Sequence, residues 1–529
     1  MSYLLLFLVS SVVLVVDQRL VNGQMGGGPS GPGAAGPPSS KTRILILGAG
    51  PSGLKAAQTL VDQGMHDFLI LEGASYYGGR VRDIPFAGAQ VEVGADRALP
   101  LAEAVESAAI GLLRTHRPNW ESMNVVDASG RNLNRAALPV WTQAGRAVRN
   151  GLNVAEELWE SHDTDMSVRD AYRTIGWLPT TALEKTIEWA YNDYWLGDRP
   201  SYASLMSHAF DTPEWVKRGP GARRPAYVTD QRGFKHFFEA NMLFLKSPTH
   251  KAKILLNKNI TQINNNAMDV QVTCADGSVY TADYAISTFS VGVLQNNVVK
   301  FTPGLPGWKV REYNRYTMGA HTKILMQFPS KFWGNTEFLL RATDRKGHYP
   351  FFTDLGSKGI YSRNVHVLMA EVTGDEARRI DRQPRSVIRN EMMAVLRGMF
   401  GPRVPDPISF HVTDWNSNSL TMGARCVFGP SLNSKCFQRI QSKVGRVLFA
   451  GEHTSLRFSS HVQGALESGA REARKAVDCL NGGACTEWVE GHQCACTGSA
   501  PAFSTNSASN LQLTGALLFA TIIFAFFNF

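Results

Sequence analysis

A turn built around three glycines has the residue types and spacing that bind a phosphate group. It consists of Gly48, Gly50, Pro51, Ser52 and Gly53, and it lies between apolar runs at 44–47 and 68–71. The first glycine permits a tight turn, the second lets a phosphate approach the backbone, and the third lets a helix pack close to a strand. A helix expected over 54–63 would direct its free N–H groups and the positive end of its dipole at the phosphate.

Glu72 follows the second apolar run, at the position from which an acid accepts hydrogen bonds from a ribose in such βαβ units. A flexible glycine-rich loop is the alternative for a glycine pattern that stands alone. Here strand, helix, second strand and terminal acid occur together, so the sequence predicts a dinucleotide-binding unit.

Three separated pieces of the chain resemble the flavin amine oxidase family, in particular its secreted polyamine oxidases. They are residues 48–53 with 78–80, residues 322–324 with 332–333, and residues 451–455; residues 305–309 follow the same branch. The shared order of these pieces over residues 43–478 identifies the chain as a member. The resemblance implies a Rossmann-like, doubly wound α/β FAD-binding domain that is interleaved with an α+β substrate-binding domain.

The same resemblance assigns residues to the cofactor, which is expected to be noncovalent FAD. Beyond the glycine turn, these are Glu72, Gly79, Arg80, Gly451, Glu452 and Val462. Glu72 would bind the adenosine ribose, Arg80 would lie near the pyrophosphate and the flavin, and Glu452 would hold the ribityl–pyrophosphate region. A surface ion pair is the alternative for Arg80 and Glu452. Cys426 lies where some members attach flavin covalently, but its neighbours do not match theirs.

Lys323 is the predicted catalytic residue, because the family's lysine in this Thr-Lys-Ile strand holds a water against flavin N5. A lysine within an apolar strand is costly to bury, and an outward-facing edge lysine is the alternative. The implied reaction is oxidation of an amine C–N bond by hydride transfer to flavin. The imine then hydrolyses to an aldehyde, and O₂ takes the electrons to give H₂O₂.

The predicted substrate pocket departs from that of polyamine oxidases. Glu92 matches an acid that attracts a cationic substrate, but His321 and His461 replace tyrosines, Arg425 lies near an expected aromatic, and Trp195 takes the place of a second acid. Such a pocket would repel a polycation, especially when the pH is below about 6.5, the ordinary pKa of histidine. It would suit an anionic or zwitterionic amine, with Arg425 as a carboxylate partner. The alternatives are an L-amino-acid oxidase and a cell-surface interaction protein that has lost efficient catalysis.

Local patterns place these residues on elements. Strands are expected at 253–256, 260–263, 270–274, 279–286, 320–328, 365–372, 408–413 and 446–450, and helices at 234–245, 385–399 and 462–478. The tryptophans of the helical stretch 99–225 are assigned to core packing.

The predicted division is a signal peptide (1–23), a Gly/Pro/Ser linker (24–40), FAD-binding segments (41–98, 226–300, 441–478), substrate-domain segments (99–225, 301–440), a cysteine-rich EGF-like fragment (479–497), and a spacer with a GPI-anchor signal (498–529).

The apolar runs at both ends of the sequence and its cysteine content indicate that the protein is exported. An apolar run at 3–16 suits a signal peptide, and the apolar tail at 511–529 after small residues and a polar spacer suits a GPI-anchor signal. The alternatives are a membrane anchor and a tail-anchored helix. The protein is therefore expected at the extracellular face of the plasma membrane, with Asn259 as a glycosylation sequon.

Four of the seven cysteines crowd into 479–496, where four cysteines allow three disulfide connectivities. Zinc binding is the competing interpretation, but no histidine pair accompanies them, so no metal site is predicted. Cys426 could pair with Cys436, which would leave Cys274 as a thiol. The net charge of +9 is modest for 529 residues and no basic block occurs, so nucleic acid is not an expected partner.

Overall fold

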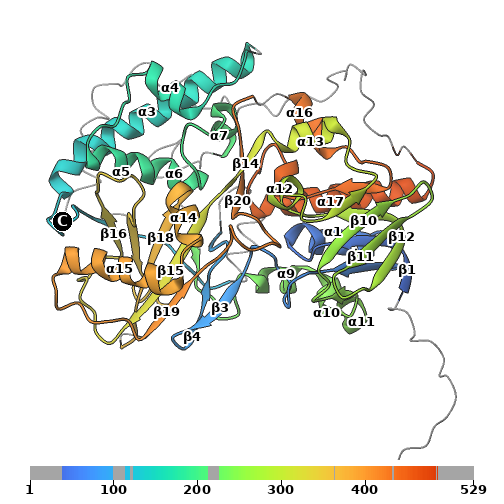
Figure 1. The fold of residues 1–529 in the computed structure, drawn as a ribbon, viewed down its shortest axis with the longest axis horizontal. Coiled ribbons are helices and arrows are strands. Elements are labelled where there is room, and N and C mark those ends of the chain that lie inside the picture. Colours follow the sequence, from blue (N-terminus) through green and yellow to red (C-terminus); the bar gives the residue numbers. More distant parts are fainter. Residues whose placement is uncertain are drawn as a thin grey trace, which may run out of the picture. The chain divides into compact units, whose positions relative to one another are not determined.

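Two β-sheets organise the protein (Figure 1). The computed structural model describes residues 39–98, 113–119, 123–161, 163–211, 226–362, 364–431, 434–483 and 485. These residues belong to one compact unit that begins at Ser39. Predictions for residues 1–38 and 486–529, including the signal peptide and the anchor signal, lie outside the described residues.

The first sheet has eight strands in the order β13-β10-β11-β12-β1-β2-β9, with β21 also beside β12. They are β1 (Ser39–Leu47), β2 (Phe68–Leu71), β9 (Ile254–Leu255), β10 (Ile260–Asn265), β11 (Val270–Cys274), β12 (Val279–Ser287), β13 (Lys300–Thr302) and β21 (Val447–Phe449). The strands β12, β1, β2, β9 and β21 run parallel. Most of their apolar residues are buried, as in parallel strands that are covered on both faces.

Helices α1 (Pro51–Asp62) and α17 (Val462–Leu480) lie side by side on this sheet (Figure 1). A Cβ at Gly469 would come within 2.1 Å of the Ser52 carbonyl oxygen, so only glycine allows the two helices to approach this closely. The packing brings the first turn of α1 next to Ser468 and Gly469 of α17, where Ser52 Oγ lies 3.4 Å from Ser468 Oγ.

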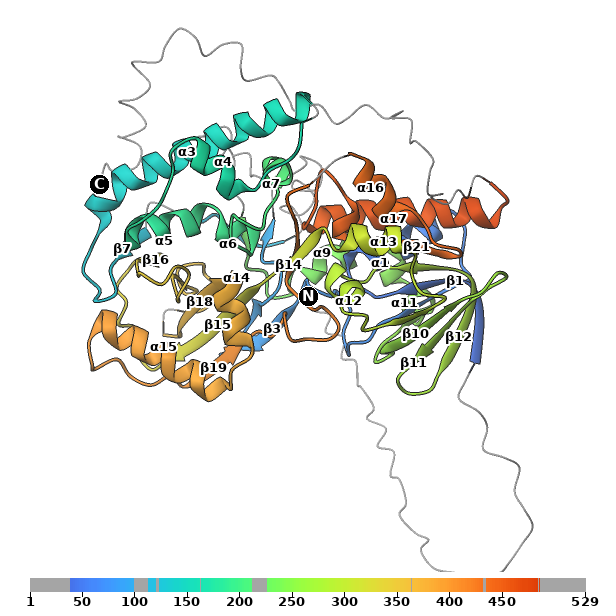
Figure 2. The same ribbon diagram turned by 45° about the horizontal axis from the view of Figure 1, so that its top comes forward.

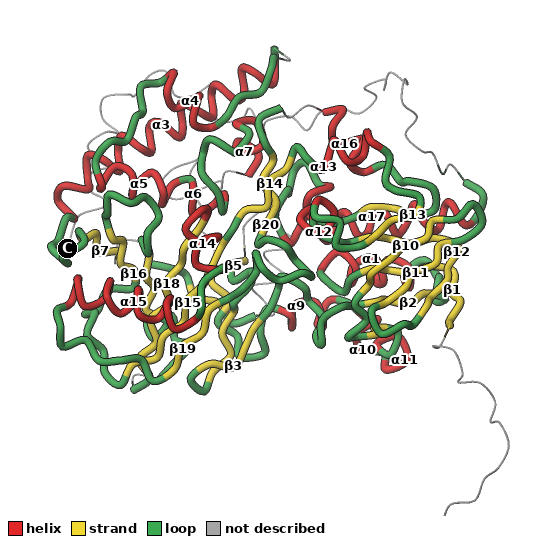
Figure 3. The backbone as a smooth tube through the Cα atoms, viewed as in Figure 1, coloured by secondary structure: helices red, strands yellow, loops and turns green. Residues whose placement is uncertain are grey.

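The second sheet has six strands in the order β19-β15-β18-β17-β16-β7. They are β7 (Met123–Val126), β15 (His321–Phe328), β16 (Phe338–Arg341), β17 (Phe351–Asp354), β18 (His366–Thr373) and β19 (Ser409–Val412). Helices α14 (Gly374–Asp381) and α15 (Arg385–Phe400) pack on one side of it (Figure 3). Helices α3 (Asn134–Glu160) and α5 (Ala182–Tyr191) lie side by side near β16 (Figure 2), and they share a core cluster with residues of β7, β16 and β17.

Shorter elements connect the two sheets. The strands are β3 (Asp83–Phe86), β4 (Ala89–Glu92), β5 (Arg97–Ala98), β6 (Thr115–His116), β8 (Ala226–Val228), β14 (Tyr316–Gly319) and β20 (Arg425–Phe428). The helices are α4 (Val168–Thr174), α6 (Asp193–Leu196), α7 (Leu205–Asp211), α9 (Lys235–Asn241), α10 (Leu243–Lys246), α11 (Pro248–Lys251), α12 (Val291–Gln295), α13 (Gly307–Tyr313), α16 (Ser434–Gln441) and the 3₁₀ turn η2 (Glu452–Thr454).

The first sheet draws its strands from residues 39–71, 254–302 and 447–449, and the second from 123–126 and 321–412. The predicted interleaved fold class is therefore confirmed, while the domain boundaries remain predictions. The single helix predicted over 234–245 is wrong. Met242 is extended, and the Phe244 N–H donates to Gln58 Oε1 at 3.1 Å rather than continuing the helix, so α9 and α10 are separate.

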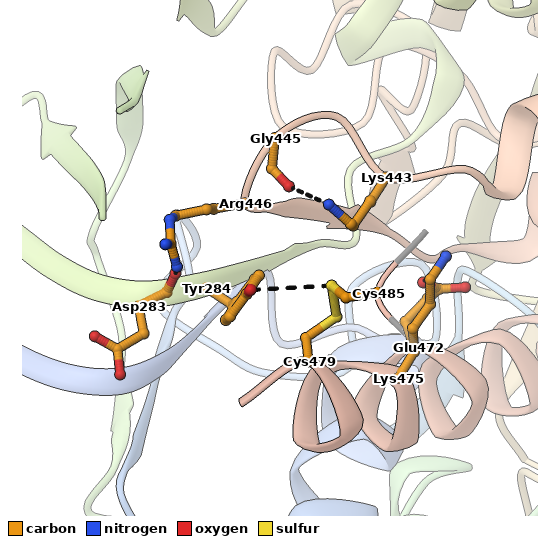
Figure 4. The surroundings of a disulfide bond; sticks show 9 residues. All are labelled: Asp283, Tyr284, Lys443, Gly445, Arg446, Glu472, Lys475, Cys479 and Cys485. Carbon is orange, nitrogen blue, oxygen red and sulfur yellow. Dashed lines mark hydrogen bonds and ion pairs between the residues drawn. A yellow bond between two sulfur atoms is a disulfide. The ribbon is translucent and has the colours of Figure 1, made fainter. Parts of the chain in front are cut away.

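A disulfide joins Cys479 at the end of α17 to Cys485 (Figure 4). It lies against Tyr284 of β12, and its Cα atoms are 4.9 Å apart. This pairing selects among the connectivities that the sequence left open; Cys494 and Cys496 lie outside the described residues. Cys274 is a buried thiol, and the predicted Cys426–Cys436 pair stays a prediction, because the Cys436 side chain is not described.

Within the described ranges, no helix combines the length and apolar character needed to cross a bilayer.

Candidate active site

One cavity of about 370 Å³ extends from the glycine turn of the first sheet to β15 of the second. Predicted site residues that line it are Gly48, Gly50, Pro51, Ser52, Glu72, Gly79, Arg80, His321, Lys323, Arg425, Gly451, Glu452, His461 and Val462. Two predicted residues do not line it, namely Gly53 and Glu92. Fourteen of the sixteen predicted site residues therefore line the cavity, although they span more than 400 positions of the chain.

The glycine turn has the geometry that its spacing predicts. Gly48 adopts a positive φ of 110°, and a Cβ at Gly53 would lie 2.0 Å from the Gly48 carbonyl oxygen, so α1 can pack this close only with glycine there. Gly50 faces Gly79, and a Cβ on Gly79 would come within 3.1 Å of the Gly50 Cα. The two glycines leave a backbone-lined cradle at the N-terminus of α1, which suits a pyrophosphate.

Glu72 lies at the cavity wall directly after β2. Its Oε2 accepts a hydrogen bond from the Ala49 N–H at 2.7 Å, and its Oε1 accepts one from the Ala74 N–H at 2.8 Å. Burial raises the pKa of Glu72, and these backbone N–H groups oppose that rise. The carboxylate is thus fixed in orientation, and each oxygen has a further lone pair for a ribose hydroxyl.

Arg80 and Glu452 form an ion pair of 2.6 Å between Nη1 and Oε1 inside the cavity. Glu452 is only 5% exposed, so the alternative of a surface pair is wrong. Burial by itself would raise the pKa of Glu452, but the Arg80 guanidinium is among the groups that bring it down to about 2. Its Oε2 has no hydrogen-bond partner of normal geometry among the described residues.

These features fit a flavin dinucleotide. The glycine cradle is a surface that a Cβ would fill, and the buried Glu452 Oε2 is an acceptor that a ligand hydroxyl or N–H could satisfy. Bound there, FAD would be held by Glu72, by the N-termini of α1 and α17, and by the Arg80–Glu452 pair. Cys426 is buried and does not line the cavity; its Sγ lies 3.4 Å from Ser459 Oγ, which supports noncovalent attachment.

Lys323 points into the other end of the cavity, and its residue is only 4% exposed. Its Nζ donates to the Gly94 carbonyl at 2.8 Å, to Asp96 Oδ2 at 2.9 Å and to the Glu92 carbonyl at 3.3 Å. The alternative of an outward-facing edge lysine is therefore wrong. Alternation along β15 places Lys323 on the same face as His321.

A cluster of ionisable groups that the sequence did not predict surrounds Lys323. Arg97 lies 3.6 Å from Asp96 and 3.9 Å from Glu371, and its Nη2 donates to the hydroxyls of Tyr194 and Tyr227. Burial would raise the pKa of Asp96, but Lys323 and Arg97 hold it well below its usual range. Asp96 and Arg97 follow β4 after a three-residue segment, and this proximity to Glu92 is the sequence signal for them.

Lys358 completes this cluster. Its Nζ lies 3.1 Å from the ring centroid of Tyr227, and burial lowers its pKa to about 7 although Asp96 and Glu371 oppose that shift. Lys358 comes from the loop after β17, far from the motifs that define the family, so local sequence carries no signal for it.

Three further predicted or aligned residues form the wall near Lys323. His321 Nε2 lies 3.1 Å from Glu371 Oε1. Arg425 donates from Nη1 to the Trp195 carbonyl and from Nη2 to Ser460 Oγ at 3.0 Å. These contacts hold its guanidinium at the cavity wall, whereas the sequence alone also allowed a position on a solvated loop. Trp195 packs against the core cluster, as its helical spacing predicts, and it also lines the cavity, with its ring centroid 4.9 Å from the Arg97 guanidinium.

The predicted role of Glu92 does not fit its position. Its Oε1 accepts a hydrogen bond from the Phe234 N–H at 2.6 Å, and its side chain is buried away from the cavity. Burial raises the pKa of Glu92 to about 8, so the carboxyl is protonated at neutral pH and offers no charge to a cationic substrate. Asp96 is instead the acid that lines the cavity beside Lys323.

We expect Glu92→Gln to improve stability at alkaline pH. A folded-state pKa near 8, above the ordinary value of 4.5, means that the native protein loses stability as pH rises from about 4.5 to 8. The glutamine variant lacks this loss, so its free energy of unfolding should exceed that of the wild type at pH 9 by on the order of 3 kcal/mol and by much less at pH 5. Denaturant unfolding at both pH values measures this, and an equal difference at both would contradict it.

Comparison with known proteins agrees with this site. The family model for flavin containing amine oxidoreductase matches residues 51–187 and 243–477. Polyamine oxidase 1 of Zea mays is 31% identical over 474 residues, which cover 85% of this chain and 93% of that protein. Polyamine oxidase 6 of Oryza sativa subsp. japonica is 30% identical over 475 residues, which cover 86% and 94%.

Solved structures share the fold. Putrescine oxidase bound to putrescine has a TM-score of 0.66 at 18% identity and covers 83% of this chain and 100% of that one. Cyclohexylamine oxidase from Brevibacterium oxydans has a TM-score of 0.63 at 19% identity and covers 83% and 99%. With the glycine cradle, the Arg80–Glu452 pair and the buried Lys323 in one cavity, the chain belongs to the flavin containing amine oxidoreductase family and is an FAD-dependent amine oxidase.

Proposed function

We propose that this amine oxidase prefers an anionic or zwitterionic amine to a polycation. Bound FAD would take the electron pair that leaves the C–N bond and pass it to O₂, which yields H₂O₂ and an imine that hydrolyses to an aldehyde. The residues of this chain orient the amine and exclude water. The observation that carries the proposal is the excess of cationic groups where the cavity meets β15.

The two carboxylates of this region are already matched by cations. Asp96 pairs with Lys323 at 2.9 Å, and Glu371 lies near Arg97 and His321. Arg425 adds a further permanent positive charge at the wall. A cationic substrate would therefore meet net repulsion in a partly desolvated cavity, where charges interact strongly.

His461 does not supply this positive charge in the way that the sequence predicted. Burial, followed by the nearby Arg425, lowers the pKa of His461 to about 4, so His461 is neutral over the physiological range. The repulsion comes mainly from guanidinium groups, which stay charged at all relevant pH values. A guanidinium at the wall can also bind a substrate carboxylate.

Polyamine oxidation is the second candidate, and the names of the relatives favour it. Oxidation of L-amino acids is a specific form of the first proposal. A cell-surface interaction protein without efficient catalysis is the third candidate, but the intact cofactor cradle and the buried Lys323 argue against it.

A peroxide assay on purified protein separates these candidates. We expect L-amino acids or other carboxylated amines to give a higher kcat/KM than spermine and spermidine. Arg425→Gln should then lower kcat/KM for carboxylated amines about 10-fold or more and leave monoamines without a carboxylate less affected, since a charge-assisted hydrogen bond contributes roughly 1.5–3 kcal/mol. Faster turnover of spermine than of every carboxylated amine would overturn the proposed preference. Peroxide from no amine would favour the interaction protein.

We also propose that the protein is exported and held at the cell surface by a GPI anchor. The Cys479–Cys485 disulfide supports an oxidising compartment, and the exposed Asn259 supports the glycosylation sequon. Phosphatidylinositol-specific phospholipase C should release the protein from intact cells. Retention on cells after treatment, with a known anchored protein released as control, would contradict the anchor.

A further inference from the structure

His321 and Glu371 form a dyad at the wall of the substrate end. His321 opens β15, and Glu371 lies on the adjacent antiparallel strand β18, opposite Lys323. The imidazole Nε2 lies 3.1 Å from Glu371 Oε1, and Tyr194 donates to Glu371 Oε2 at the same distance of 3.1 Å. Glu371 is fully buried, while the His321 side chain is 22% exposed. The pair thus joins a buried acid to a ring that reaches the cavity.

The hydrogen bond to Glu371 determines which nitrogen of His321 can accept a proton. Burial would raise the pKa of Glu371, but His321 and Arg97 lower it, so Glu371 is a carboxylate and can only accept hydrogen bonds. The neutral imidazole must then carry its proton on Nε2, which leaves a lone pair on Nδ1. Nδ1 makes no hydrogen bond to any residue that the structure describes.

The reaction requires such an acceptor. An aliphatic amine is an ammonium ion at neutral pH, and its nitrogen must lose a proton before the C–N bond can be oxidised. Lys323 is poorly placed to take this proton, because its ammonium group already donates to three acceptors. Asp96 is engaged by Lys323 and lies beside Arg97.

We propose that His321 is the base that removes a proton from the substrate ammonium group at Nδ1, and that Glu371 is the positioning residue that holds the ring. This inference rests on the proposed amine oxidation. In the step, the N–H bond of the ammonium breaks, its electron pair stays on the amine nitrogen, and an N–H bond forms at Nδ1. No electrons leave the substrate here; the proton returns to water before the next turnover.

Charged groups of both signs come from the elements around His321. Glu371 of β18 contacts its ring, and the ring centroid of Tyr194 of α6 lies 5.8 Å away. Asp96 and Arg97 at β5, Lys323 of β15 and Arg425 of β20 line the same cavity. Glu371 is thus the anion that contacts the ring, while three cations line the cavity.

The first test is anaerobic flavin reduction as a function of pH, with the fastest substrate among spermine, benzylamine and L-lysine. The His321→Ala variant should reduce its flavin about 10²–10⁴ times more slowly at neutral pH, as expected for loss of a general base. The deficit should shrink at alkaline pH, where the amine is already neutral, and added imidazole should restore part of the rate. The control His366→Ala, at the far end of β18, should retain the wild-type profile.

The second test does not depend on turnover. Nitrogen-15 NMR of histidine-labelled holoenzyme should show His321 as the Nε2–H tautomer, and Glu371→Gln should alter this signal. An Nδ1–H tautomer, or a His321→Ala variant with the wild-type pH profile and no imidazole rescue, would overturn the dyad. Failure of all three amines to reduce the wild-type flavin, together with the Nε2–H tautomer, would count against the proposed function instead.

Discussion

Lys323→Met should bind FAD normally but turn over about 100- to 1,000-fold more slowly, the usual loss when one preorganised donor at a reaction centre is removed. Methionine has similar length but cannot donate a hydrogen bond, so any water or substrate group that Lys323 orients would lose its partner. The visible spectrum and the rate constants for flavin reduction and reoxidation provide the measurement.

This variant should still fold, because Asp96 would not be left as an isolated buried charge. Arg97 lies 3.6 Å from Asp96, and Lys358 lowers the carboxyl pKa as well. The matched control is Lys331→Met, which removes an ion pair with Asp354 beyond the far end of β15 and should leave turnover unchanged. Wild-type turnover in Lys323→Met would remove Lys323 from the mechanism.

Arg80→Met should lose most of its FAD. The substitution leaves Glu452 buried without its cation, and breaking a buried ion pair in this way costs about 3–5 kcal/mol. Because the same carboxylate lies at the cavity wall, both cofactor retention and thermal stability should fall. Flavin content after gel filtration and the unfolding temperature with and without added FAD measure the two effects.

Two further variants separate charge from geometry at this pair. Arg80→Lys keeps the positive charge and should retain more FAD than Arg80→Met. The double variant Arg80→Met/Glu452→Gln removes the unpaired buried charge of Glu452, so it should recover part of the stability without recovering full FAD binding. A full complement of FAD in Arg80→Met would show that the pair has no role at the cofactor.

The glycine turn of the cofactor site could be predicted from the sequence, because the backbone angles that it needs are set by residues that are neighbours in the chain. A glycine turn needs particular backbone angles, and Gly48 at a φ of 110° and the contact under Gly53 follow from residue type alone. Lys323 was predicted from the resemblance of its Thr-Lys-Ile strand to the family, whereas the apolar residues around it left open whether it is buried.

The substrate half could not be predicted in the same way, because its properties depend on partners from distant segments. Glu92 looked like a substrate-binding acid, yet it bonds to the Phe234 backbone and is neutral at pH 7. Asp96 and Glu371 acquire their roles only when the fold brings Lys323 beside Asp96, and Arg97 and His321 beside Glu371. Trp195 had helical spacing typical of a core residue, but the short helix α6 directs it to the cavity.

The most direct test is the ultraviolet–visible spectrum of the purified, folded protein before and after anaerobic addition of candidate amines. If the glycine turn and Glu452 hold opposite parts of one flavin, the protein will be yellow, and at least one amine will bleach it. A folded protein that is colourless and takes up no added FAD would contradict the assignment of the cavity to the cofactor.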